Sequence, residues 1–250
     1  MKKIILTVLA ILVYNISFAQ HLPIYAVTTY ELIFSSAQYN VFDSKSGNVL
    51  RFSPWFNLEE SVNFDIGTAV GFTAGMSVKN IGIIHKLSDP STIDPKFEST
   101  TIKKKFRSYN IGIPVSFKLG NLSQFFIYGG YEFEIPINFR EKTYINGAKT
   151  KYESEWFSNK TPRYMQSLFL GLKFPYNLGI KAKYYLTNFF ANDCEDYVHD
   201  YPAIQYKDFE ARVFYLSLTI DLFNKMDTRI TIPTPSNRNK RNSEPQYYYD

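Results

Sequence analysis

One short segment gathers side chains that bind metals in many proteins. Residues 193–200 read Asp-Cys-Glu-Asp-Tyr-Val-His-Asp, so carboxylates, a thiol and an imidazole lie close together along the chain. Such groups can bind a divalent cation, but their spacing matches neither a calcium-binding EF-hand loop nor a standard zinc motif. The sequence therefore predicts no metal site and no cofactor, and metal binding by this segment stays a minor alternative.

A second pair with catalytic potential is His85 and Ser88, which are three positions apart. A His and a Ser can together activate a nucleophile in lipid hydrolases and acyltransferases. A lone pair of this kind is common in any sequence and means little before its geometry is known. We therefore predict no catalytic residue and no enzyme, and keep a lipid-modifying activity as an alternative.

A third feature is a set of charged residues that recur at alternate positions of segments whose other positions are apolar. Glu132 and Glu134, for example, would share one face of a strand, about 6.5–7 Å apart. Charges on an enclosed face need partners, so we expect ion pairs, with at least one of these glutamates bound to a Lys or Arg. A proton or small-ion path is the alternative. The full set is Arg51, Lys79, Lys118, Glu132, Glu134, Arg140, Lys173, Lys181, Lys183 and Asp221.

The elements that must position these charges are predicted to be β-strands, because polar and apolar residues alternate with a period of two. The alternation is clearest over residues 109–119 and 125–139. It also marks 50–58, 72–78, 167–174, 180–187 and 213–222, and more weakly 30–41. Short turns are expected at 57–61, 120–123 and 175–178, and long polar links at 86–105, 143–162 and 191–207. Together these segments predict eight antiparallel strands.

The N-terminus has the anatomy of a cleaved export signal. Lys2 and Lys3 precede an apolar run over residues 4–13, and Ser17 and Ala19 supply the small residues of a cleavage site. The run is too short to span a membrane as a helix, which needs about 20 apolar residues. We expect residues 1–19 to be a signal peptide, 20–223 a barrel and 224–250 a flexible periplasmic tail, rich in Pro, Asn, Arg and Lys.

Composition favours a membrane barrel over a soluble one. The chain holds 22 Phe and 20 Tyr, yet its mean hydropathy is only −0.23, as expected where alternate residues face lipid. The more polar strand faces carry small residues suited to a crowded lumen: Gly75, Gly112, Gly130 and Gly171. A soluble barrel such as a lipocalin, with its apolar face inside, is the alternative. We predict an all-β fold, a closed antiparallel transmembrane β-barrel in the outer membrane of a Gram-negative cell.

Basic residues cluster where the predicted outer loops meet their strands. The net charge is +5, and the acidic neighbours of an exported chain are lipid and lipopolysaccharide, not nucleic acid. Contact with lipopolysaccharide phosphates and a merely solvated surface are equally weighted interpretations. The residues concerned are Lys103, Lys104, Lys105, Arg107, Lys142, Lys160 and Arg163.

Over residues 28–223 the chain resembles the small bacterial outer-membrane β-barrels, the broad group that holds PorT-like and OmpA/OmpX-like eight-stranded barrels. The resemblance rests on the strand pattern and on four segments: residues 50–53 (Leu-Arg-Phe-Ser), 79–82 (Lys-Asn-Ile-Gly), 112–114 (Gly-Ile-Pro) and 183–186 (Lys-Tyr-Tyr-Leu). It implies an assembly signal in the last strand, which residues 215–223 resemble, although Phe223 is out of phase with Leu222 and Ile220.

These features leave three functions open. The first is a structural or partner-binding barrel, as a subunit of a larger outer-membrane complex, with protein partners in the outer membrane or, through the tail, in the periplasm. The second is a porin-like transporter of small solutes. The third is a lipid-modifying enzyme.

Overall fold

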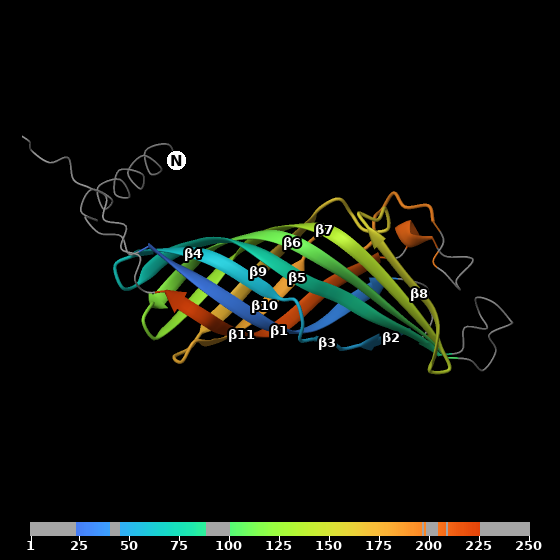
Figure 1. Ribbon diagram of the computed structural model, residues 1–250, viewed down its shortest axis with the longest axis horizontal. Coiled ribbons are helices and arrows are strands. Elements are labelled where there is room, and N and C mark those ends of the chain that lie inside the picture. The colour runs from blue at the N-terminus through green and yellow to red at the C-terminus, as the bar shows by residue number, and fades with distance from the viewer. Residues whose placement is uncertain are drawn as a thin grey trace, which may run out of the picture.

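Eight antiparallel strands close into a ring in the computed structural model, which describes residues 24–40, 46–88, 101–196, 198, 205–208 and 210–225 (Figure 1). The pairing of the last strand with the first closes the ring, so the predicted fold class is confirmed. In order of pairing the strands are β1 (Ile24–Asn40), β4 (Leu58–Ile66), β5 (Val70–Ser88), β6 (Thr101–Asn121), β7 (Phe125–Ile145), β9 (Met165–Lys173), β10 (Leu178–Tyr185) and β11 (Glu210–Lys225). The signal peptide and residues 226–250 of the tail lie outside the described residues.

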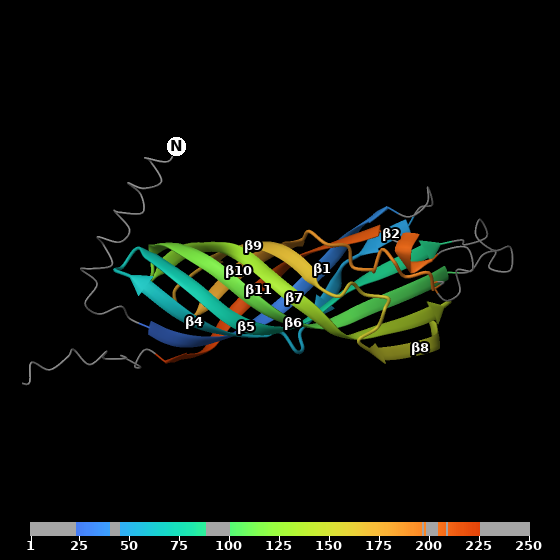
Figure 2. The same cartoon turned by 90° about the horizontal axis from the view of Figure 1, so that it is seen from above.

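Three shorter strands complete the wall: β2 (Ser46–Val49) on β5, β3 (Arg51–Ser53) on β1, and β8 (Ala148–Trp156) on β7. Two of them, β2 and β8, lie at the end away from the short turns (Figure 2). The link predicted at 143–162 is therefore largely a hairpin of β7 and β8. Its turn is Asn146–Gly147, with φ angles of 48° and 86°, the Asn-Gly dipeptide that two-residue hairpins favour.

The predicted turn at 57–61 is wrong, because these residues lead into strand β4. The turn that joins β4 to β5 lies farther along the chain, at residues 67–69, and begins at Gly67, whose φ of 68° suits glycine. Before β4 the chain kinks at Phe56, which has a φ of 63°. The side chain of Asn57 replaces backbone hydrogen bonds that the kink interrupts. Its Nδ2 donates to Ser53 O at 2.8 Å, and its Oδ1 accepts from Asn80 N at 2.8 Å. The turns predicted near 120–123 and 175–178 are present.

The wall changes polarity part-way along the barrel. On β6 the outward face is apolar from Ile111 to Leu119, and beyond Tyr109 it becomes basic. The large apolar side chains exposed on this part of the wall form a belt that would face lipid. Exposed aromatic residues lie at the outer edge of the belt: Trp55, Phe56, Trp156, Phe157 and Tyr164. The described residues contain no helix that is long and apolar enough to cross a membrane. The belt places the protein in the outer membrane. In barrels of this class the short turns lie on the periplasmic side, and the two ends of this barrel are named on that basis.

The interior of the barrel has two tiers, and the boundary between them lies at the level where the outward face changes from apolar to basic. Inside the lipid belt the lumen holds buried charged residues. Beyond the belt the wall stands in water, so apolar side chains turn inward and form a core that includes Phe106 and Phe139. Residues of the link between β10 and β11 cover this core, among them Phe189, Phe190 and Val198.

A bulge at Ile137 reverses the two faces of β7. Asn110 pairs with Pro136 and Tyr109 with Asn138, which leaves Ile137 without a partner in the register. One extra residue moves every later side chain to the opposite face. As a result Glu141 points inward, and Arg140, which the unbroken alternation assigned to the lumen, points outward beside Arg107.

Candidate functional site

The first ion-pair cluster crosses the lumen from β1 to β10. Lys181 Nζ lies 2.8 Å from Glu31 Oε1 and 2.9 Å from Glu59 Oε2. Lys79 Nζ also binds Glu31, and it lies 3.2 Å from Glu59 Oε2. The side chains of Glu31 and Lys79 are fully buried. Two carboxylates and two ammonium groups therefore balance one another's charge inside the lumen.

A second cluster holds the two glutamates of β7. Lys183 Nζ lies 2.6 Å from Glu132 Oε2 and also binds Glu134, so the expected ion pair is present on both carboxylates. Glu134 further accepts hydrogen bonds from Tyr185 OH at 2.8 Å and from Asn110 Nδ2 at 2.7 Å. With every charge paired and buried, this cluster bridges the lumen between β7 and β10.

Two further pairs lie at the periplasmic mouth. Lys118 Nζ is 2.6 Å from Asp65 Oδ1, and Lys173 Nζ is 2.5 Å from Asp221 Oδ1. Tyr25 OH donates to Asp65 Oδ2 at 2.8 Å. Lys118, Lys173 and Asp221 line a cavity of about 190 Å³ at this end of the lumen.

Two members of the predicted lumen set are placed elsewhere. Arg140 faces outward because of the bulge at Ile137. Arg51 donates to Asn80 O at 3.0 Å and to Asn80 Oδ1 at 2.6 Å, in the seam where β3 pairs with β1 instead of β5. The guanidinium of Arg51 therefore binds amide oxygens and does not join the carboxylate clusters.

Sequence reasoning missed three anions of the lumen, Glu31, Glu59 and Asp65. Glu31 lies on the weakly patterned first strand, and the other two lie in or beyond the wrongly placed turn. A signal was available, since the predicted set held seven cations and only three anions. An enclosed lumen with that imbalance would be strongly unfavourable, which indicates that further carboxylates face inward.

Lys104 and Lys160, predicted at the surface, are buried in the outer tier. An extended strand turns the middle residue of Lys103-Lys104-Lys105 to the opposite face, and Lys104 Nζ lies 2.7 Å from Glu141 Oε1. Lys160 Nζ lies 2.5 Å from Glu153 Oε1. Burial would lower the pKa of Lys160, but hydrogen bonds and charges from Glu153 and Glu155 outweigh burial and raise that pKa.

The outward face beyond the belt forms a surface that we name the basic wall. In its register Lys86 lies opposite Lys103, Lys105 opposite Lys142, and Arg107 opposite Arg140. Tyrosine rings lie between these cations, with Lys105 Nζ 5.0 Å from the centre of the Tyr144 ring. The basic wall comprises Lys86, Lys103, Lys105, Arg107, Arg140, Lys142 and Lys149, with Tyr109, Tyr144 and Tyr152 among them.

The cations of the basic wall face one another across neighbouring strands. Among the residues that the structure describes, no carboxylate lies within salt-bridge distance of any of the seven. Like charges directly opposite on neighbouring strands destabilise a sheet. An external anion would remove this cost, and phosphates at the membrane surface are such anions.

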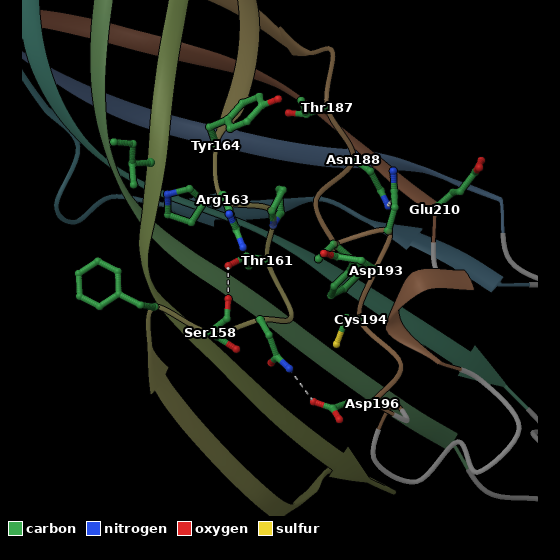
Figure 3. Close-up of a pocket in the computed structure, with 18 of the residues that line it drawn as sticks. Ser158, Thr161, Arg163, Tyr164, Thr187, Asn188, Asp193, Cys194, Asp196 and Glu210 are labelled. Atoms are coloured by element: carbon green, nitrogen blue, oxygen red, sulfur yellow. Dashed lines mark hydrogen bonds between the residues drawn. The ribbon is translucent and has the colours of Figure 1, made fainter.

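A cavity of about 1080 Å³ lies between the β8–β9 connection and the β10–β11 connection (Figure 3). Arg163, Asp193 and Asp196 line it, and Asn159 Nδ2 donates to Asp196 Oδ2 at 3.2 Å. Burial raises the pKa of the Cys194 thiol, which disfavours the thiolate that binds metals. No group of three metal-binding side chains occurs in the described part of the chain; His199 and Asp200 lie outside it.

Of the His85 and Ser88 pair, only the His85 side chain lies in the described part of the structure. His85 is on β5 and is buried in the outer tier. The side chain of Ser88 lies outside the described residues, so a lipid-modifying activity of this pair stays an alternative.

No protein-family model matches the sequence, and no curated protein matches it. Among solved structures the chain is similar to Neisserial surface protein A, with 13% identity, a TM-score of 0.36, and coverage of 79% of this chain and 95% of that one. It is also similar to Ail, the attachment invasion locus protein of Yersinia pestis, in complex with the heparin analogue sucrose octasulfate, with 10% identity, a TM-score of 0.37, and coverage of 79% and 98%. The strand pairing and the lipid-facing belt of this chain, independently of these likenesses, identify it as a small eight-stranded barrel of the outer membrane.

Proposed function

We propose that the protein is a non-conducting, partner-binding barrel, a subunit of a larger outer-membrane complex, in keeping with the PorT-like side of its resemblance. The observation that carries the proposal is that side chains cross the lumen and obstruct it. Ion pairs of Glu31, Lys181 and Lys183 cross its charged tier, and an apolar core occupies the outer tier. A barrel of eight strands has room for side chains and little else. Its function then lies on its surfaces, which argues against a porin-like transporter.

Bilayer recordings test the absence of a pore. Purified protein in planar bilayers should give no unit conductance steps above those of detergent buffer alone. Buried ion pairs cross the lumen, so this result should hold in high salt, where screening weakens only exposed pairs. Reproducible steps of a single amplitude would contradict the proposal and favour the porin-like alternative.

The basic wall supports a second part of the proposal, namely that the protein binds lipopolysaccharide through phosphate groups. The wall begins at Tyr109, where the lipid belt ends, and this is the level of the phosphorylated headgroups. Its facing cations, such as Arg107 and Arg140, have no carboxylate partner in the part of the chain that the structure describes, and both contact the ring of Tyr109. Each Lys or Arg near an anionic surface contributes about 1 kcal/mol.

Replacement of Lys105, Arg107, Arg140 and Lys142 together by Ala should weaken lipopolysaccharide binding about tenfold or more. The measurement is titration of the barrel in nanodiscs with lipopolysaccharide and with its dephosphorylated form. Lys207→Ala, on the β10–β11 connection, is the matched control and should change nothing. Equal affinity for both lipids, or no loss in the quadruple variant, would contradict phosphate binding.

A further inference from the structure

One carboxylate lies on the lipid-facing side of the wall. Glu60 on β4 is exposed, and it alternates with the exposed apolar residues Leu58 and Val62. In the register it lies between Thr28 on β1 and Met76 on β5. Its lumen-facing neighbours Glu59 and Ser61 occupy the opposite face, so its outward direction follows from the strand itself.

The depth of Glu60 places it well inside the lipid belt. It lies six residues above Ile66, which ends β4 at the periplasmic turn. With a rise of about 3.3 Å per residue and a strand tilt of about 40°, this amounts to about 15 Å. The apolar band of such barrels is about 25 Å tall, so Glu60 is near its middle, far from headgroups on either side.

A carboxylate in that position is only partly satisfied by its own chain. Thr28 Oγ1 donates a hydrogen bond to Glu60 Oε2, and among the described residues no cation forms a salt bridge with Glu60. Lipid tails offer no donor. An ionisable side chain at this depth is costly, and such a residue is a candidate for a functional contact.

We propose that the face around Glu60, formed by β1, β4 and β5, is the site where a membrane-embedded protein partner docks, and that the partner supplies a basic or amide side chain to the Glu60 carboxylate. The inference rests on the proposed partner-binding function and assigns it a surface. Alanines flank the carboxylate in the next row of the register, Ala26 on β1 and Ala74 on β5. These small side chains allow another wall to approach closely.

A second copy of the chain does not fit this face. Among the strand residues whose side chains the structure describes, no Lys or Arg points outward between the level of Tyr109 and the short turns. A two-fold contact centred on Glu60 would bring two carboxylates together, which repel. Charge complementarity therefore favours a different chain as the partner.

The test combines photo-crosslinking in cells with a change at Glu60. A photoreactive amino acid at Met76, next to Glu60, should give one discrete adduct with another protein, and the same probe at Leu170 should not. Glu60→Leu should reduce the Met76 adduct at least tenfold. Val62→Leu, on the same face, should leave it unchanged. The lumen is untouched by these substitutions, so every variant should remain non-conducting.

A second measurement separates loss of docking from loss of folding. In lipid vesicles without partner, Glu60→Leu should unfold at a higher denaturant concentration than wild type, because it removes a carboxylate from the lipid face. An adduct that persists in Glu60→Leu would overturn the assigned surface and leave the partner-binding function standing. Adducts at twice the protein's own mass would overturn it in favour of a dimer. If neither Met76 nor any other lipid-facing site tested gave a protein adduct, both the assigned surface and the partner-binding function would be contradicted.

Discussion

Replacement of Lys183 by Met should lower the free energy of unfolding by about 3–5 kcal/mol, the cost of removing one partner from a buried ion pair. Lys183 is the shared cation of Glu132 and Glu134, and all three side chains are fully buried. Without it, two carboxylates two residues apart on one strand would repel in a site that water does not reach. Denaturant unfolding in lipid vesicles measures the change.

The reciprocal variant, with both Glu132 and Glu134 changed to Gln, should also lower stability without preventing insertion, because the lipid face is unaltered. The triple variant that also carries Lys183→Met is the informative control. If the three side chains act as one ion-pair cluster, its loss of stability should be smaller than the sum of the separate losses. Additive losses would show that these charges do not interact.

Replacement of Val115 by Arg should lower the stability of the inserted barrel by about 2–4 kcal/mol, the cost of a cation at the middle of the lipid face. Val115 is half exposed on the outward face of β6. The same change at Leu119, near the periplasmic edge, should cost only about 0–1 kcal/mol. Unfolding in vesicles, with Val115→Leu as the conservative control, measures the gradient. Equal costs at both positions would contradict a lipid belt of this depth.

The strands with uninterrupted alternation were predictable. On β6 and β7 the lipid face is apolar at every second residue over the span of the belt, so side-chain chemistry alone identifies the strand and its faces. The turn between β6 and β7, near residues 120–123, was predictable from its Gly and Asn residues. The identity of the lumen face followed from its glycines and charges.

The errors arose where a strand breaks its own pattern. Glu59 and Glu60 are adjacent charges, which suggest a turn, yet one faces the lumen and the other the lipid. The alternation cannot reveal a lipid-facing carboxylate that is retained for a contact outside the chain. Only the pairing of Thr28, Glu60 and Met76 in neighbouring strands locates it.

The basic residues were correctly located along the chain but wrongly divided between faces. One extra residue at Ile137 sends Arg140 outward, and a bulge leaves no mark in the periodicity of a single strand. Lys104 was grouped with its neighbours by charge, although strand geometry turns it inward to Glu141. The Asn146–Gly147 dipeptide, by contrast, was a hairpin signal present in the sequence.

Accessibility scanning along β6 tests the account most directly. Single spin labels would replace outward residues from Lys103 to Leu119 in a Cys194→Ser background, with the protein in lipid vesicles. The account predicts contact with oxygen dissolved in the bilayer at Ile111, Val115 and Leu119, and contact with a water-soluble nickel chelate at Lys103 and Lys105. The change should occur at Tyr109. Access of the nickel chelate along the whole outward face would contradict it, because the barrel would then be a soluble one.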